Sequence, residues 1–199
     1  MPAPAGRHHR QAWGEFVALP ENRSALRAAR SLFRALANER SRLPFNPLVL
    51  HGPPGTGKSH LARALAHHVA DAEAVLTVQT IAAADLARAT LAAEAGPDAE
   101  PTWVDESLRT CDLLILEDLH QLLAKAADAL CDLLDRRTKR RKATVLTMNA
   151  GPAALTHLPR RLTSRLAAGL IVQLEPLASR SRKVILHREA KHRGVKLTA

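Results

Sequence analysis

The stretch Leu48-Val-Leu-His-Gly-Pro-Pro-Gly-Thr-Gly-Lys-Ser-His-Leu61 decides the fold of this chain. It fits the pattern G-x-x-x-x-G-K-[ST] of a phosphate-binding loop, with the fixed positions at Gly52, Gly57, Lys58 and Ser59. Three apolar residues before the loop predict a buried strand, and a helical apolar periodicity follows it. The alternative is a glycine turn between a strand and a helix. Because strand, loop and helix follow in the order that the motif needs, the phosphate site is favoured.

The loop predicts a nucleotide site. Glycines let the backbone curl so that its N–H groups point at phosphate oxygens, and the helix N-terminus adds a partial positive charge. We expect the nucleotide to contact the loop and the start of its helix, namely Gly52, Pro53, Pro54, Gly55, Thr56, Gly57, Lys58, Ser59 and His60. Lys58 is expected to reach the β- and γ-phosphates, and the Ser59 hydroxyl to hold Mg²⁺. The predicted cofactors are ATP or ADP with Mg²⁺.

Composition limits the kind of protein. The chain has 199 residues, enough for one α/β domain, and a net charge of +10. This charge favours an anionic partner, and nucleic acid is the first candidate. Two alternatives explain the charge about equally well: a basic surface that keeps the protein soluble, or a base-composition bias of the gene toward Arg and Ala codons. Cys111 and Cys131 lie outside any paired metal spacing and suit a reducing compartment. Residues 1–12 lack the apolar part of a secretory signal, and no run of 18 apolar residues occurs, so we expect a soluble cytoplasmic protein.

Apolar runs alternate with helical patterns along the chain. The predicted strands cover residues 48–50, 74–79, 112–118, 143–148 and 170–174. The predicted helices cover residues 24–38, 61–69, 80–91, 103–110, 121–137, 158–166 and 179–192, with Ser24 and Thr80 as expected N-caps. This alternation predicts an α/β fold, a five-stranded parallel sheet with helices on both faces. Residues 1–12 are expected to be disordered, and the domain to cover residues 13–199.

Polar residues follow two of the predicted strands. In Asp112-Leu-Leu-Ile-Leu-Glu-Asp118, two carboxylates end a buried strand, where ligands bind in open α/β sheets. We expect Glu117 to orient Mg²⁺ through water and Asp118 to polarise the attacking water; solvated acids that cap the next helix are the alternative. Asn149 follows the next strand and is expected between the loop and these carboxylates, near the γ-phosphate. A turn residue before Gly151 is the alternative there.

Cations gather in two places. Six of them crowd the end of the predicted helix 121–137: Arg136, Arg137, Lys139, Arg140, Arg141 and Lys142. They complement the helix dipole, and a nucleic-acid patch is the alternative. Arg161 and Arg165 are four residues apart on the helix 158–166, so they share one face and are expected to project outward. Leu158, Leu162 and Leu166 should anchor this helix to the sheet, and pairing of the arginines with acids of the same chain is the alternative.

Taken in order, these motifs resemble the AAA+ ATPase domain of the bacterial replication initiator DnaA over roughly residues 13–197. The likeness is carried by residues 15–23, 45–61, 112–121, 149 and 160–170. It implies that residues 15–23 lie beside the adenine and that Asn149 is the sensor 1 residue. It also implies that Arg165 is an arginine finger, which reads the γ-phosphate of a neighbouring subunit, with Arg161 as a second interface arginine. ATP-dependent assembly in DNA replication initiation, or in its regulation, is the implied function.

The chain departs from the family pattern in two respects. Position 117 is Glu, where the family usually has Asp. Only one helix is expected after the fifth strand, so the family's helical lid with its sensor 2 arginine and its C-terminal helix-turn-helix domain are expected to be missing. We therefore expect weak hydrolysis and DNA binding with low sequence specificity, with self-assembly or other AAA+ replication proteins as further partners. The alternatives are a DnaC/IstB-type helicase loader or transposition helper, and a nucleotide-binding adaptor without hydrolysis.

Overall fold

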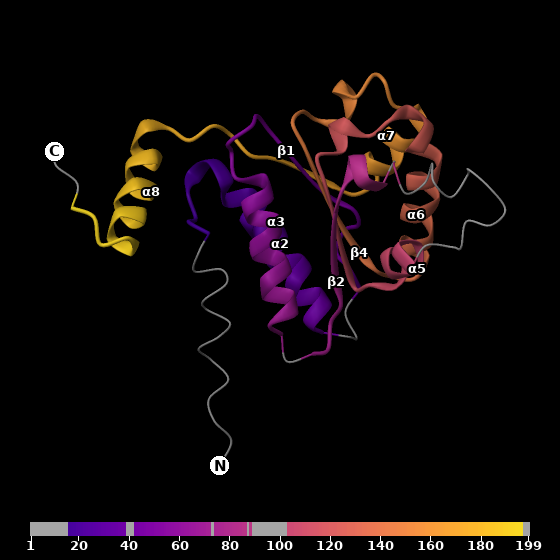
Figure 1. Cartoon of the computed structure of the whole chain (residues 1–199), viewed down its shortest axis with the longest axis horizontal. Helices are drawn as coiled ribbons and strands as arrows, with labels where there is room; N and C mark the ends of the chain where they lie inside the picture. The colour runs from indigo at the N-terminus through magenta and orange to yellow at the C-terminus, as the bar shows by residue number, and fades with distance from the viewer. Residues whose placement is uncertain (1–15, 39–41, 73, 87, 89–102, 197–199) are drawn as a thin grey trace, which may run out of the picture.

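The computed structural model describes residues 16–38, 42–72, 74–86, 88 and 103–196, which form one sheet flanked by helices (Figure 1). All paired strands are parallel, in the order β2-β3-β4-β1-β5. The strands are β1 Leu48–His51, β2 Val78–Ala82, β3 Leu113–Glu117, β4 Ala143–Met148 and β5 Leu170–Gln173. The predicted five-stranded parallel sheet is therefore confirmed.

Helices cover both faces of the sheet (Figure 1). One face carries α2 (Arg23–Ala37) and α3 (Lys58–Ala70). The other carries α5 (Trp103–Thr110), α6 (Ala127–Lys139) and α7 (Arg160–Ala167). The last helix, α8 (Ser179–His192), stands beside the α2 and α3 side of the molecule, at the end of an extended segment that leaves β5 (Figure 1).

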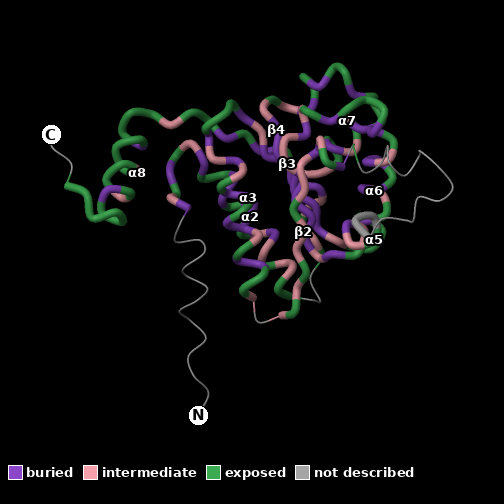
Figure 2. Tube along the Cα trace, in the orientation of Figure 1, coloured by how far each residue is buried: buried purple, intermediate pink, exposed green. Residues whose placement is uncertain are grey.

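Each strand contributes alternate side chains to two cores. Leu48 and Leu50 pack toward α2 and α3, whereas Val49 between them packs toward α6 and α7. All three are at most 1% exposed, which is why the strand reads as an unbroken apolar run. Burial is concentrated in the sheet and the helices that flank it, while α8 is mostly exposed (Figure 2). Within the described residues, no helix has the length and apolarity that a membrane crossing needs.

The second strand begins later than predicted. It starts at Val78, which pairs with Leu113, instead of at residue 74. Thr77 just before it is held by the Asp112 carboxylate, which accepts hydrogen bonds from the Thr77 N–H at 2.8 Å and from its hydroxyl at 2.9 Å. Thr80 consequently lies inside β2 and caps no helix. Residues 83–86 and 88 are helical, whereas residues 87 and 89–91 of the predicted helix, the loop 96–101 and residues 1–12 lie outside the described part of the chain.

Two other helix starts also differ from the prediction. The helix predicted from residue 121 begins at Ala127, because two short 3₁₀ turns come first: η2 (Leu119–Gln121) and η3 (Ala124–Ala126). Leu123, which precedes η3 and lies outside the regular helix, is 50% exposed. The first helix begins at Arg23, with Asn22 at the N-cap position, so Ser24 lies inside the helix and is not its cap. Sequence periodicity could not separate 3₁₀ turns from the helix that follows them.

The strand order brings three loops together at the carboxyl edge of the sheet. Strand β4 lies between β1 and β3, so the residues after β4 lie between those that follow its two neighbours. The Gly52 N–H donates to the Met148 carbonyl at 3.3 Å, which ties the start of the loop to the end of β4. The predicted position of Asn149, between the loop and the carboxylates, follows from this order.

Candidate nucleotide-binding site

Glycine is required where the loop leaves β1 and where it enters α3. Gly52 has φ 149°, and a Cβ atom there would lie 2.1 Å from the Leu174 carbonyl oxygen. Gly57 has φ 93° at the N-cap of α3, so the helix can begin at Lys58. Such left-handed residues turn successive N–H groups inward, next to the positive end of the helix. The loop therefore has the backbone form that binds phosphate.

Lys58 is curled into the loop. Its side chain is 6% exposed, and Nζ donates to the carbonyls of Gly52 at 2.7 Å and Pro53 at 2.9 Å. Burial lowers the pKa of Lys58, and the nearby charge of Asp118 acts in the opposite direction. The cation thus lies where phosphate oxygens can replace the carbonyls as its partners. Ser59 follows it in the first turn of α3 and is half-buried.

The two carboxylates after β3 differ in their surroundings. Glu117 Oε1 is buried and has no hydrogen-bond partner among the described residues. Asp118 has a left-handed backbone, with φ 56° and ψ 47°, and its N–H donates to Thr147 Oγ1 at 3.1 Å. Burying a carboxylate oxygen without a hydrogen-bond partner lowers the stability of the fold. The side chain of Glu117 is therefore suited to bind a cation.

The oxygen groups present fit magnesium. The Ser59 hydroxyl and the Glu117 carboxylate are the hard ligands that Mg²⁺ prefers, and Mg²⁺ usually takes only one or two carboxylates together with waters and phosphates. Within the described ranges, no group of three or more His, Cys, Asp and Glu side chains could hold a metal ion alone. Any magnesium would therefore be shared between these residues and phosphate oxygens.

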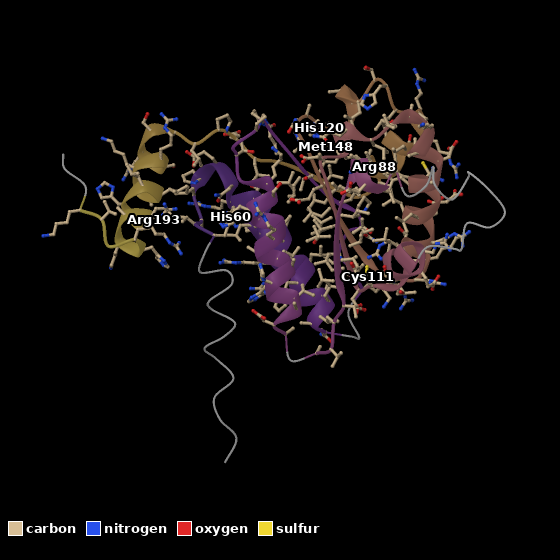
Figure 3. All side chains as sticks on the ribbon, viewed as in Figure 1. His60, Arg88, Cys111, His120, Met148 and Arg193 are labelled. Carbon is tan, nitrogen blue, oxygen red and sulfur yellow. The ribbon has the colours of Figure 1, made fainter. Side chains whose placement is uncertain are left out.

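Two histidines to which the sequence motifs assign no role lie at the same edge of the sheet. His120 Nε2 lies 2.8 Å from Asn149 Nδ2, and Asn149 follows Met148, the last residue of β4; Figure 3 labels His120 and Met148. His51 ends β1; its burial, and then the charge of Lys58, lower its pKa. The signal available in the sequence was the position of each histidine at the end of an apolar strand or within three residues of it.

Residues 16–23, the described part of the segment expected beside the adenine, pack against the first turn of α3, where the loop ends. The ring of Phe16 is 6% exposed and makes an edge-on contact with His60, with 5.3 Å between ring centroids. Further along the segment, the Glu21 carboxylate accepts hydrogen bonds from the Ala178 N–H and the Ser181 hydroxyl, both at 2.9 Å. The segment thus joins the loop to the start of α8, and its place beside the adenine stays a prediction.

The arginines of α7 pair with acids of α6 in the same chain. Arg165 binds Asp135 through two nitrogens, Nε at 2.8 Å and Nη2 at 2.7 Å. Arg161 contacts Asp132 at 2.9 Å and Asp128 at 3.3 Å. The expected anchors Leu158, Leu162 and Leu166 are buried. Of the two arrangements considered for the arginines, the structure of the single chain shows intrachain pairing, and the arginine-finger role stays a prediction.

A parallel sheet in which β4 separates the loop strand from the carboxylate strand is a P-loop fold, and its strand order and flanking helices match those of AAA+ domains. The family model described as the bacterial DnaA ATPase domain matches residues 8–173. The chain belongs to this family.

Similarity to individual DnaA proteins supports this assignment. The chromosomal replication initiator protein DnaA of Rhizobium meliloti (strain 1021) is 33% identical over 168 residues, which are 83% of this chain and 34% of the relative. The chain thus spans about one third of the length of such relatives. Domain III of the Thermotoga maritima replication initiation protein DnaA superposes with a TM-score of 0.83 at 23% identity, covering 100% of this chain and 79% of that one.

Two further solved structures bear on the alternatives. A replication initiator DnaA bound to AMPPCP and single-stranded DNA superposes with a TM-score of 0.80 at 23% identity, covering 93% of this chain and 56% of that one. The DnaC helicase loader is less similar, with a TM-score of 0.64 at 17% identity, covering 84% and 99%. The fold therefore agrees better with the initiator than with the loader.

Proposed function

We propose that this chain binds ATP with Mg²⁺ and is the nucleotide-binding core of a DnaA-like assembly ATPase in DNA replication initiation or its regulation. One observation carries the nucleotide site: the loop encloses the cation Lys58 beside Asp118, while Glu117 next to it keeps a buried oxygen unpaired. Membership of the DnaA ATPase-domain family, and the fold shared with a DnaA bound to AMPPCP, support ATP as the ligand.

Each residue has a defined task in this proposal. The loop N–H groups of residues 52–59 and the Lys58 ammonium bind the phosphates. Ser59 and Glu117 hold Mg²⁺, which when bound neutralises phosphate charge. Asp118 polarises the attacking water, and Asn149 orients it near the terminal phosphate.

Calorimetry on the Lys58→Ala variant tests nucleotide binding. The wild type should bind both ATP and ADP, and the variant neither, because the phosphates then lose the one cation that the loop encloses. Lys125→Ala is a matched control, since Lys125 is an exposed lysine on η3. Equal nucleotide affinity in wild type and Lys58→Ala would contradict the proposal.

We further propose weak hydrolysis that depends on Asp118. An arginine that stabilises the transition state contributes roughly 10³-fold or more to phosphoryl transfer, and in the isolated chain Arg165 is engaged by Asp135. Asp118→Asn should abolish turnover and retain ATP binding. Turnover by the wild type at tens per second, near the rate of typical kinases, would contradict weak hydrolysis. ATP binding without any turnover would favour the adaptor.

DNA and further AAA+ subunits are the proposed partners, in the cytoplasm. A DnaA of the same fold has been solved with single-stranded DNA, and the net charge of +10 suits an anionic partner. The helicase-loader alternative predicts a complex with a helicase instead of ATP-dependent self-assembly. Sedimentation of the chain alone, with ATP and with ADP, separates these two functions.

A further inference from the structure

The side chains of His120 and Asn149 are held together by the backbone. Asn149 follows β4, and His120 lies in η2 just beyond β3, the strand that pairs with β4. Asp118 turns the chain into η2, and its N–H bonds to Thr147 on β4 at 3.1 Å. The distance of 2.8 Å between His120 Nε2 and Asn149 Nδ2 is therefore set by two fixed segments.

Two arrangements of the hydrogen atoms are compatible with this contact, because Oδ1 and Nδ2 of an asparagine carboxamide have nearly the same size and can exchange places. If Asn149 Nδ2 donates, the imidazole proton sits on His120 Nδ1, which is buried and has no partner among the described residues. If the carboxamide is turned over, His120 Nε2 donates to Asn149 Oδ1, and only an unprotonated Nδ1 stays unpaired. A buried N–H without a partner is rarer than an unpaired acceptor, so the second arrangement is favoured.

The second arrangement changes what Asn149 offers to a ligand. With Oδ1 bonded to His120, the Nδ2 amide group points away from the imidazole at the end of β4, between the loop strand and the carboxylate strand. An N–H donor attracts a phosphate oxygen there, whereas Oδ1 in the same place would repel it. Since ATP carries a terminal phosphate that ADP lacks, the orientation of this carboxamide affects the affinity for ATP and not the affinity for ADP.

We propose that His120 is a positioning residue, which holds the Asn149 carboxamide with Nδ2 toward the terminal phosphate and so makes the site prefer ATP to ADP. This inference rests on the nucleotide binding proposed above. It adds a residue that itself touches no nucleotide.

The test compares ATP and ADP affinities by calorimetry in three variants of the full chain. His120→Phe keeps a ring and removes both nitrogens, and His120→Gln restores a donor near the position of Nε2. His67→Phe is the matched control, because it changes an exposed histidine in the last turn of α3, at the end of that helix opposite to the loop. In His120→Phe we expect ATP affinity to fall about tenfold, with ADP affinity unchanged, because one hydrogen bond to a charged group is lost. His120→Gln should recover most of the loss, and His67→Phe should leave both affinities unchanged.

A second measurement needs no variant. The ¹⁵N chemical shifts of the His120 imidazole in the wild type report which nitrogen carries the proton, and we expect protonated Nε2 in the ATP complex. A proton on Nδ1 alone would overturn the proposal, as would equal loss of ATP and ADP affinity, or no loss, in His120→Phe. If the wild type binds neither nucleotide, the proposed function fails instead, which is a different result.

Discussion

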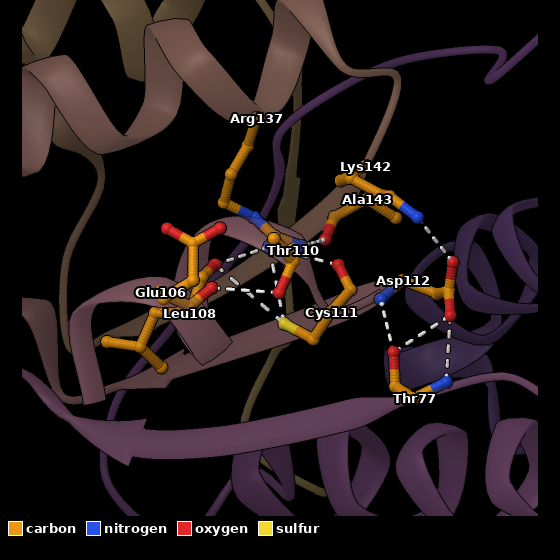
Figure 4. A network of polar contacts seen from close by, with 9 residues as sticks. All are labelled: Thr77, Glu106, Leu108, Thr110, Cys111, Asp112, Arg137, Lys142 and Ala143. Carbon is orange, nitrogen blue, oxygen red and sulfur yellow. Dashed lines mark hydrogen bonds and ion pairs between the residues drawn. The ribbon is translucent and has the colours of Figure 1, made fainter. Parts of the chain in front are cut away.

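Arg137 at the end of α6 is fully buried, although it is an arginine in a run of cations, and Figure 4 shows the polar network around it. Its guanidinium donates to the carbonyls of Leu108, Cys111 and Ala143, and to the hydroxyl of Thr144. Burial lowers the pKa of Arg137, and the nearby Cys111 acts against that shift. This side chain therefore joins α6 to α5, β3 and β4 and is removed from the basic surface that the sequence suggested.

Replacing Arg137 should destabilise the fold strongly. In Arg137→Met, three buried carbonyls lose their side-chain donor, and each unsatisfied polar group costs roughly 1–3 kcal/mol. We expect the free energy of unfolding, measured by urea denaturation, to fall by about 3 kcal/mol or more. The neighbouring Arg136 is exposed, so Arg136→Met should stay within about 0.5 kcal/mol of the wild type. Similar losses in both variants would show that the buried network contributes little.

At the scale of elements, local sequence predicted most of the sheet and little of the pairing between helices. Strands β1 and β4 and helix α8 were predicted from apolar runs and periodicity, which are local signals. The start of β2 depends on Asp112, 35 residues from Thr77, and no local pattern reports such a contact. The same holds in the site, where the loop was predicted but the contact of His120 with Asn149, 29 residues apart, was not.

The pairing of α7 with α6 leads to a prediction about assembly. The Arg165–Asp135 ion pair is only partly buried, and ion pairs near the surface are weak, so a phosphate of a neighbouring subunit can replace Asp135 as the partner of Arg165. Arg165→Ala should leave ATP binding by the monomer intact and remove ATP-dependent assembly, whereas Asp135→Asn should keep or increase it. Sedimentation with ATP and with ADP measures this. Arg160→Ala, an exposed arginine of the same helix, is the control.

Other outcomes would give Arg165 a different role. If Arg165→Ala assembles like the wild type, its function is to hold α7 on α6, and Asp135→Ala should then lower the unfolding midpoint as much as Arg165→Ala does. A variant that cannot bind ATP as a monomer would also contradict a finger that acts on the neighbouring subunit.

At the scale of the whole molecule, the cationic side chains fall into two kinds: some are held in contacts within the chain, and others are exposed to solvent. At the end of α6, Arg137 is buried, Lys142 pairs with Asp112 at 2.7 Å, and Arg140 lies 3.8 Å from Glu106. Lys139 and Arg141 are exposed and form no ion pair within the described part of the chain. A second group of exposed cations lies on α8, which carries one acidic residue, Glu189.

The exposed cations at the end of α6 and those on α8 are two possible contacts for DNA, and each leads to a different prediction. Affinity should fall steeply with salt and depend little on sequence, because phosphate contacts dominate. If the end of α6 contacts the backbone, Lys139→Glu with Arg141→Glu should reduce the slope of log K against log salt by about 2, or about 1 for each contact. Arg180→Glu with Lys183→Glu on α8 is the matched double variant, with the same change in charge. Fluorescence anisotropy over a salt series compares them.

The comparison decides where DNA binds, because a general loss of positive charge would weaken both double variants equally. A smaller slope only in the α6 variant places the contact at the end of α6. The same result only in the α8 variant places the contact on α8. No binding by the wild type at low salt, or a preference for one duplex sequence that persists at high salt, would contradict DNA binding through phosphates.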